Sequence, residues 1–291
     1  MGSRRCRLER AVVVTGGGRG IGKALVDRLT AEGYYVVAVE HDAVVAQALG
    51  ERIAGAGEVV LGDCADRALL ADVGRRFSQE RPLWGWINNA SAVDEGNLHD
   101  PQSESVDRVF SVNIGGYFWG AASAIQCFVR QRSAGVVLNI SSVHGRTGFS
   151  NNAAYDVSKG AVDALTRYIA VEYGQVGIRA NAIAPGAVYT EGSRRAIDAT
   201  PNPRATLRAI ADQNPLRRVA APSEIAGIAS FLLSDAASFI TGQSIAVDGG
   251  LTAACMPFQV DAALRTRYGN DAIPPRTSDW DTARHLQGVD R

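Results

Sequence analysis

A glycine-rich turn between a buried strand and a helix is the feature that most constrains this chain. Residues 11–15 read AVVVT, a valine-rich run typical of a strand covered on both faces. Residues 16–22 then read GGGRGIG, and helical spacing of apolar positions continues from 21 to 32. Such a turn brings the backbone close to an anion at the N-terminus of the helix, so the pattern predicts a dinucleotide phosphate site. The residues assigned to it are Gly16, Gly20, Ile21 and Gly22.

Short apolar runs alternate with longer amphipathic stretches along the rest of the chain. We expect further strands at 34–40, 59–62, 85–89, 136–141, 178–184 and 244–248. We expect helices between them at 43–55, 66–80, 103–131, 153–174 and 222–234. Strands alternating with helices favour right-handed crossovers. The sequence therefore predicts an α/β fold, a Rossmann-type doubly wound sheet of about seven parallel strands with helices on both faces.

Two segments interrupt this alternation. Residues 189–215 form a long excursion that contains two closely spaced prolines, which is typical of a functional lid. Residues 255–291 follow the last strand and are polar. We therefore divide the chain into a single catalytic domain, 1–254, and a C-terminal extension, 255–291, that is partly disordered or packs on a neighbouring subunit.

Composition argues against several classes of function. Lys plus Arg and Asp plus Glu number 30 each, so no basic face for nucleic acid or an anionic membrane is expected. No apolar run reaches the roughly 20 residues of a membrane span, and the arginine-rich N-terminus lacks the apolar core of a secretion signal. The four cysteines and four histidines are scattered, which disfavours disulfides and a metal site and favours the cytoplasm.

Two charged residues bear on the choice of dinucleotide. Glu40 ends the second strand, where a carboxylate can accept hydrogen bonds from the adenosine ribose and would repel a 2′-phosphate. Arg19 lies inside the glycine turn, where a guanidinium could pair with that phosphate. A carboxylate beside a phosphate is costly, whereas an unused surface arginine is not, so Glu40 favours NAD while NADP stays possible.

Polar side chains at the ends of the third and fourth strands are the next candidates. Asp63 could accept the adenine amino group, with Cys64 beside it, although an Asp here could also cap the following helix. Asn88 and Asn89 end the fourth strand. We assign Asn88 to tying neighbouring strands together and Asn89 to the cofactor.

Tyr155 and Lys159 are the candidate proton-transfer pair. They are four residues apart in a helical pattern and therefore share one helix face. A free tyrosine titrates near pH 10, and a neighbouring ammonium favours the phenolate and lowers that pKa. Lys23 and Lys159 are the only lysines in an arginine-rich chain. A compact ammonium that can also reach ribose hydroxyls is a reason for lysine at position 159.

Two further polar residues are predicted to lie near this pair. Ser142 ends the fifth strand, so its hydroxyl can hold the substrate oxygen against the phenol at the carboxyl edge of the sheet. Ser141 should point the other way. Asn113 lies inside a long helical stretch, where asparagine is unfavourable, so it binds water, distorts the helix or hydrogen-bonds to a neighbouring helix.

Over about residues 10–253 the chain resembles the short-chain dehydrogenase/reductase family. The motifs occur in the family's order: TGxxxGIG from Thr15, Asp63, Asn88-Asn89-Ala90, Asn113, Ser142, Tyr155-x-x-x-Lys159 and Pro185-Gly186. The resemblance implies NAD(P)-dependent interconversion of a secondary alcohol and a ketone. It further implies that Asn113 holds a water in a proton relay, Ser142 orients substrate, Tyr155 is the acid/base, and Lys159 binds ribose and lowers the tyrosine pKa.

The resemblance extends to the nicotinamide contacts and to assembly. It places Pro185, Gly186, Val188 and Thr190 around the nicotinamide, and it implies a homotetramer or homodimer. His144 and Asn152 lie between Ser142 and Tyr155, so we expect them to line the substrate pocket. Alternative functions are an NADP-preferring carbonyl reductase and a dinucleotide-binding sensor without catalysis.

The chain departs from the family at one position near the predicted nicotinamide site. The family usually has glycine after Asn-Asn-Ala, and this chain has Ser91. The added side chain narrows that space or contributes a hydroxyl to the pocket.

Overall fold

A single parallel sheet organises the computed structural model, which describes residues 10–77 and 81–254. Its strand order is β3-β2-β1-β4-β5-β6-β7, and each neighbouring pair is parallel. The predicted Rossmann-type sheet is confirmed. The strands are β1 (Ala11–Thr15), β2 (Tyr35–Glu40), β3 (Gly57–Leu61), β4 (Leu83–Asn88), β5 (Gly135–Ile140), β6 (Ile178–Pro185) and β7 (Ser244–Val247).

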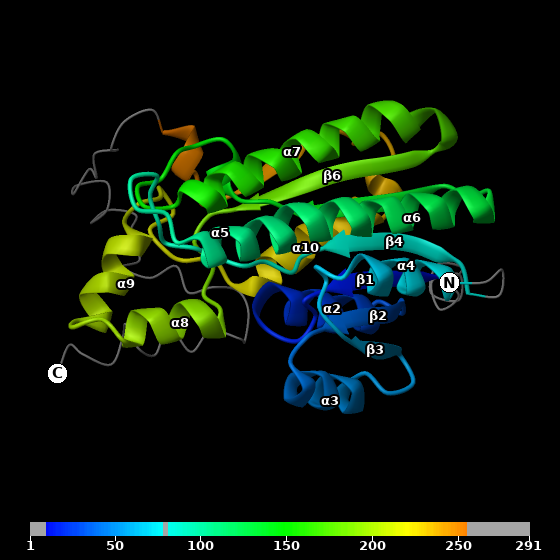
Figure 1. Cartoon of the computed structure of the whole chain (residues 1–291), viewed down its shortest axis with the longest axis horizontal. Coiled ribbons are helices and arrows are strands. Elements are labelled where there is room, and N and C mark those ends of the chain that lie inside the picture. The colour runs from blue at the N-terminus through cyan, green and yellow to red at the C-terminus, as the bar shows by residue number, and fades with distance from the viewer. Residues whose placement is uncertain (1–9, 78–80, 255–291) are drawn as a thin grey trace, which may run out of the picture.

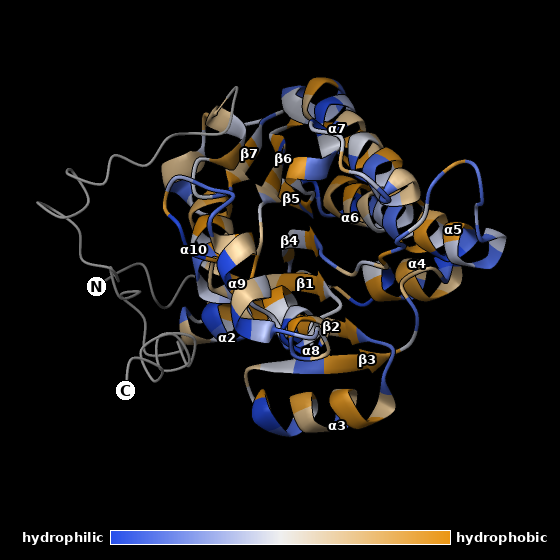
Figure 2. Ribbon diagram, turned by 90° about the vertical axis from the view of Figure 1, so that its left-hand side faces the viewer, coloured by the Kyte–Doolittle hydropathy of each residue, from blue (hydrophilic) through white to orange (hydrophobic). Residues whose placement is uncertain are grey.

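Helices cover both faces of this sheet (Figures 1 and 2). One face carries α2 (Gly20–Ala31), α3 (Ala43–Arg52) and α10 (Pro222–Leu233). The other carries α4 (Arg67–Arg75), α6 (Tyr117–Gln131) and α7 (Ala153–Tyr173). Alternate residues of a strand face opposite sides, so Val12 and Val14 enter one core cluster and Val13 enters the other. This explains why the central strands are apolar throughout.

Two short helices begin at aspartate caps. Asp42 accepts hydrogen bonds from the backbone N–H groups of Val44 and Val45 and begins α3. Asp66 accepts from Ala68 at 2.8 Å and begins α4. Each cap is worth about 1 kcal/mol.

The helix expected over 103–131 is interrupted. It consists of α5 (Ser103–Phe110), a π-helical turn (Ser111–Gly116) and α6. Such turns are rare and occur often at functional sites. The polar residue that the sequence analysis singled out in this stretch, Asn113, lies in the π-helical turn.

The excursion at 189–215 contains regular structure that the sequence analysis did not assign. It forms α8 (Glu191–Asp198) and α9 (Pro203–Ala211), which lie side by side at one end of the molecule (Figure 1). Ile197, Leu207 and Ala211 bury a small apolar cluster with Val219. Local apolar contacts therefore give this segment its own packing.

The predicted extension, 255–291, lies outside the described residues, as does the N-terminal segment 1–9. Within residues 10–77 and 81–254, no helix is both long and apolar enough to span a bilayer. The same residues contain no cluster of His, Cys, Asp and Glu suited to a metal ion.

Candidate active site

Tyr155 and Lys159 lie one turn apart on α7, as predicted. The Lys159 ammonium is 5.3 Å from the centroid of the Tyr155 ring. Lys159 is 1% exposed, whereas Tyr155 is partly exposed. The helix therefore presents a phenol at the surface of the site with an amine buried beneath it.

Lys159 is held by the end of β5. Its Nζ donates hydrogen bonds to the carbonyl oxygen of Ile140 at 3.0 Å and to the hydroxyl of Tyr117 at 3.4 Å. The Tyr117 hydroxyl in turn donates to the same carbonyl at 2.9 Å. Burial lowers the pKa of Lys159 to about 7, against the opposing influence of the Asp163 carboxylate.

The pKa of Tyr155 differs from the sequence expectation. Burial raises it above the ordinary value of 10.0, although hydrogen bonds from the hydroxyls of Ser142 and Ser91 act to lower it. That Lys159 lowers this pKa stays a prediction. Loss of water around the phenol outweighs the local hydrogen bonds.

Ser142 lies two residues beyond Ile140, the end of β5, at the carboxyl edge of the sheet. Its hydroxyl makes a side-chain hydrogen bond that acts to lower the pKa of Tyr155. The same hydroxyl accepts a hydrogen bond from His144 N at 3.3 Å. The hydroxyl of Ser141 donates to the Lys159 carbonyl oxygen, a different partner at 3.4 Å. The two serines therefore make different contacts, as expected from their alternation along the strand.

Asn113 joins the end of β4 to α7. Its Oδ1 accepts from Ala92 N at 2.8 Å, and its Nδ2 donates to Ala92 O at 2.9 Å and to the Ser158 hydroxyl at 3.1 Å. Asn113 and Ser158 are fully buried. The amide of Asn113 is thus bound to protein groups, which is the interhelical alternative of the sequence analysis.

His144 packs against the acid/base candidate. Its ring stacks on Phe149 with centroids 3.9 Å apart and meets Tyr155 edge-on at 5.0 Å. Its Nδ1 lies 2.5 Å from the Asp156 carboxylate, which also accepts from Phe149 N at 2.9 Å. The predicted pocket residue Asn152 instead donates to the Ser150 carbonyl within its own loop.

The glycine turn has the backbone that its sequence predicts. Gly16 and Gly20 have positive φ angles of 65° and 51°. A Cβ on Gly22 would lie 1.8 Å from the Gly16 carbonyl oxygen. Asn89 donates to the carbonyls of Thr15 and Gly16 at 2.9 and 3.0 Å, so its side chain fixes the turn.

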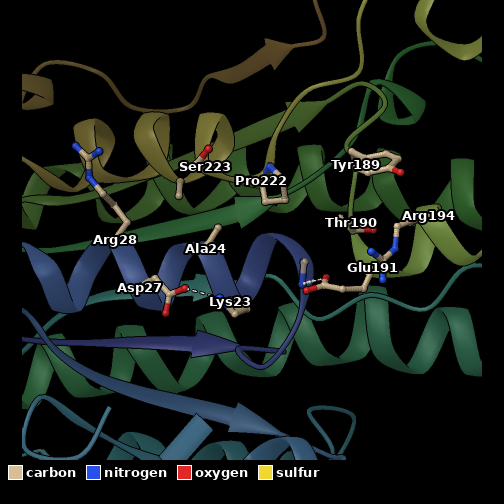
Figure 3. Close-up of a pocket in the computed structure, with 12 residues that line it drawn as sticks. Lys23, Ala24, Asp27, Arg28, Tyr189, Thr190, Glu191, Arg194, Pro222 and Ser223 are labelled. Atoms are coloured by element: carbon tan, nitrogen blue, oxygen red, sulfur yellow. Dashed lines mark hydrogen bonds and ion pairs between the residues drawn. The ribbon is translucent and has the colours of Figure 1, made fainter. Parts of the chain in front are cut away.

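The N-terminus of α2 is covered by α8. The N-cap Arg19 gives α2 no side-chain hydrogen bond, and the first turn carries no acidic residue. Instead, Gly20 N donates to the Glu191 carboxylate at 2.9 Å, as Figure 3 shows. A carboxylate from another element therefore stands where a helix N-terminus attracts phosphate.

A cavity of about 470 Å³ adjoins this contact. It lies between α2, α8 and the start of α10 (Figure 3). Lys23, Arg28 and Arg194 contribute basic side chains to its lining, and Asp27 and Glu191 acidic ones.

Glu40 is buried and fixed by three backbone groups. It accepts hydrogen bonds from the N–H groups of Gly18, His41 and Asp42 at 3.0, 2.9 and 3.1 Å. The competing cation, Arg19, is bound to the Asp42 carboxylate at 2.7 Å. The chain thus offers a fixed carboxylate at the end of β2, and its one candidate for pairing a 2′-phosphate already has an acidic partner.

Asp63 does not cap α4, because Asp66 does. It accepts from Ala65 N at 2.9 Å and pairs with Arg108 at 2.6 Å. Burial raises the pKa of Asp63, but these two partners outweigh it and the pKa falls below the ordinary value. The Cys64 thiol belongs to the core, and burial raises its pKa to about 12, so only its backbone is suited to a cofactor contact.

The end of β6 leads to the glycine turn. Pro185 is the last residue of the strand, and Gly186 N donates to the Val247 carbonyl at 3.1 Å. Val188 forms a bridge with Ala220. Thr190 caps α8 and lies so close to Gly20 that a Cβ there would be 3.0 Å from the threonine methyl.

These side chains fit a nicotinamide dinucleotide. The glycine turn, the α2 N-terminus and the Glu40 carboxylate could hold the adenosine and phosphates, and Lys159 lies at the end of β5, two strands along the sheet from the glycine turn. Sequence reasoning missed four residues that support this site: Tyr117, Asp156, Ser158 and Glu191. Ser158 gave one signal, because a serine inside a helix often bonds to the preceding turn.

Comparison with known proteins agrees with this arrangement. A family model described as "Enoyl-(Acyl carrier protein) reductase" matches residues 16–252. The 2-(S)-hydroxypropyl-CoM dehydrogenase 3 of Xanthobacter autotrophicus is 35% identical over 253 residues, which are 85% of this chain and 98% of that one. Levodione reductase of Leifsonia aquatica is 36% identical over 261 residues, 84% of this chain and 95% of that one.

A solved structure shares the architecture. The chain titled "ElxO with NADP Bound" is 25% identical, with a TM-score of 0.78, over 84% of this chain and 100% of that one. The matches in sequence and structure extend over most of the described residues. The chain belongs to the short-chain dehydrogenase/reductase family and is an NAD(P)-dependent oxidoreductase that acts on CH–OH groups.

Proposed function

We propose that this protein interconverts a secondary alcohol and a ketone with NAD in preference to NADP, using Tyr155 as the acid/base. The observation that carries the proposal is the convergence of Tyr155, Ser142 and Lys159 at the carboxyl edge of the sheet. This is the edge at which open α/β sheets bind ligands.

Tyr155 and Ser142 act directly on the substrate oxygen. In oxidation, the substrate hydroxyl lies against both side chains, and the Tyr155 phenolate accepts its proton. In reduction, the phenol returns that proton to the carbonyl oxygen. The bound dinucleotide supplies the hydride acceptor or donor. Ser142 fixes the oxygen at hydrogen-bond distance from the phenol, which favours a single reactive geometry.

Lys159 and Asn113 support the phenol. Lys159, anchored on Ile140, presents an amine beneath the Tyr155 ring and can donate to ribose hydroxyls. Because both N–H groups of the Asn113 side chain are bound, to Ala92 O and to the Ser158 hydroxyl, a relay water would have to bind an oxygen of Asn113. The Asn113 side chain has a positioning role, because it holds the loop at Ala92 against Ser158 of α7.

The preference for NAD rests on two carboxylates. Buried Glu40 accepts three backbone hydrogen bonds, which fixes a negative charge where a 2′-phosphate would lie. Asp42 binds Arg19, the candidate partner for that phosphate. NADP remains the alternative cofactor for a reductive function.

We further propose a homotetramer or homodimer in the cytoplasm. Helices α6 and α7 expose large apolar side chains that a partner subunit would cover. They are Phe118, Val129, Val157, Tyr168 and Val171. The unpaired thiols of Cys64 and Cys127 fit a reducing compartment. We propose 1–254 as the catalytic domain with 189–215 as its lid, and 255–291 as a C-terminal extension.

Fluorescence titration of the purified protein with NADH and with NADPH tests the cofactor proposal. Tighter binding of NADH is the expected result. Tighter binding of NADPH would show that Arg19 leaves Asp42 to meet the phosphate, and would favour the reductase alternative. Binding of NADH without turnover of any secondary alcohol or ketone would favour the sensor.

A further inference from the structure

We propose that Ser91 is a further catalytic residue of this protein, a second hydroxyl that contacts the Tyr155 phenol beside Ser142. This inference rests on the proposed function of Tyr155. It concerns the loop after β4, which approaches the phenol from the strand next to β5.

The backbone on both sides of Ser91 is fixed. Before it, Ala90 N donates to the Thr15 hydroxyl at 3.2 Å. After it, Ala92 exchanges two hydrogen bonds with the Asn113 amide, at 2.8 and 2.9 Å. Ser91 itself is exposed. The loop therefore holds one solvent-facing hydroxyl at a defined place at the edge of the sheet.

The same hydrogen-bond network fixes the helix turn that carries the phenol. Asn113 donates to the Ser158 hydroxyl at 3.1 Å, and Ser158 donates to the Tyr155 carbonyl oxygen at 2.7 Å. Ala92, next to Ser91, is thus linked to Tyr155 through two buried side chains. This linkage fixes the position of the Ser91 loop relative to the helix turn that carries the phenol.

The Ser91 hydroxyl is able to reach the phenol. Its hydrogen bond to the Ala92 carbonyl is long, 3.4 Å, so rotation of the hydroxyl costs little. Hydrogen bonds from both Ser142 and Ser91 act to lower the pKa of Tyr155 against the effect of burial. Two donors on the phenolate stabilise it more than one does.

Glycine, which the resemblance to the family predicts at the position of Ser91, has no hydroxyl to donate. The chain therefore supplies an additional hydrogen-bond donor to the Tyr155 phenol, whose pKa is raised by burial.

The pH dependence of alcohol oxidation tests the proposal in S91A, S91G and S91T. We expect the inflection in the pH dependence of kcat to lie about half a pH unit or more higher in S91A and S91G than in the wild type. At pH values below that inflection, their kcat should be about threefold to tenfold lower. S91T, which keeps a hydroxyl, should stay near the wild-type profile. S111A, an exposed serine on the π-helical turn, is the control. Equal profiles for S91A and the wild type would overturn the proposal.

A second measurement separates failure of this inference from failure of the proposed function. Tyrosinate absorbance, compared between each variant and the same variant with Y155F, reports the titration of Tyr155 without any substrate. A higher midpoint in S91A supports the proposal even if no alcohol is oxidised. An unchanged midpoint contradicts it even if Tyr155 is essential for turnover.

Discussion

The amine of Lys159 donates a hydrogen bond to the carbonyl oxygen of Ile140 at 3.0 Å and lies 5.3 Å from the centroid of the Tyr155 ring. Ile140 is the last residue of β5, so the strand fixes the amine directly. The fold thereby places an ionisable group in a fully buried position, and this has a measurable consequence for stability.

Replacing Lys159 by Met keeps the side-chain length and removes the amine. Burial lowers the pKa of Lys159 from 10.5 to about 7, so between these values the unfolded chain binds a proton that the folded chain does not. Wild-type stability should therefore rise with pH through this window. We expect the free energy of unfolding of the wild type, minus that of K159M, to increase by on the order of 3 kcal/mol from pH 7 to 10.

Denaturant titrations at several pH values measure this difference. K23M, at the chain's other lysine on the surface of α2, is the control for loss of a lysine that is not buried. A difference between the wild type and K159M that stays constant from pH 7 to 10 would show that the amine remains charged in the folded protein.

Freeing Arg19 should improve NADPH binding. D42N removes the carboxylate that binds this guanidinium at 2.7 Å, and asparagine still caps α3. We expect NADPH to bind about threefold to tenfold more tightly and NADH to change little. The gain should disappear in the double variant D42N/R19A. If D42N leaves NADPH binding unchanged, Arg19 does not face the 2′-phosphate.

Neutralising Glu191 should strengthen dinucleotide binding. Its carboxylate accepts the Gly20 N–H at the N-terminus of α2, where it competes with a phosphate for the same positive end. We expect E191Q to bind NADH a few times more tightly, measured by fluorescence. D198N, at the far end of α8, is the control. Weaker binding by E191Q would show that Glu191 instead holds α8 in the cofactor-binding position.

Removing the Asn113 amide should destabilise the protein. N113A leaves the partly buried backbone groups of Ala92 without their partner, at a cost of about 1–3 kcal/mol in the free energy of unfolding. S111A, on the same π-helical turn, should change it by less than about 0.5 kcal/mol. Urea denaturation of the two variants distinguishes these results. Equal stabilities would mean that water replaces the lost hydrogen bonds.

The sequence predicts those parts of the site that depend on local spacing. The glycine turn follows from its place between β1 and α2, and the shared face of Tyr155 and Lys159 follows from four-residue spacing on one helix. The buried strands are equally clear, since a valine-rich run such as β1 packs on both faces.

Contacts between distant parts of the chain were not predictable in this way. Glu191 binds Gly20 across 171 positions, and Tyr117 supports Lys159 across 42. No local pattern specifies such pairs. The raised pKa of Tyr155 has the same origin, because its largest cause is burial by the assembled fold rather than a neighbour on α7.

The most direct test of the account is the oxidation of a panel of secondary alcohols with NAD by the wild type and by Y155F, with NADH binding measured on both. Y155F removes only the phenolic hydroxyl. The account predicts that it loses nearly all turnover, at least about a hundredfold, while binding NADH as the wild type does. Undiminished turnover in Y155F would contradict the assignment of Tyr155 as the acid/base.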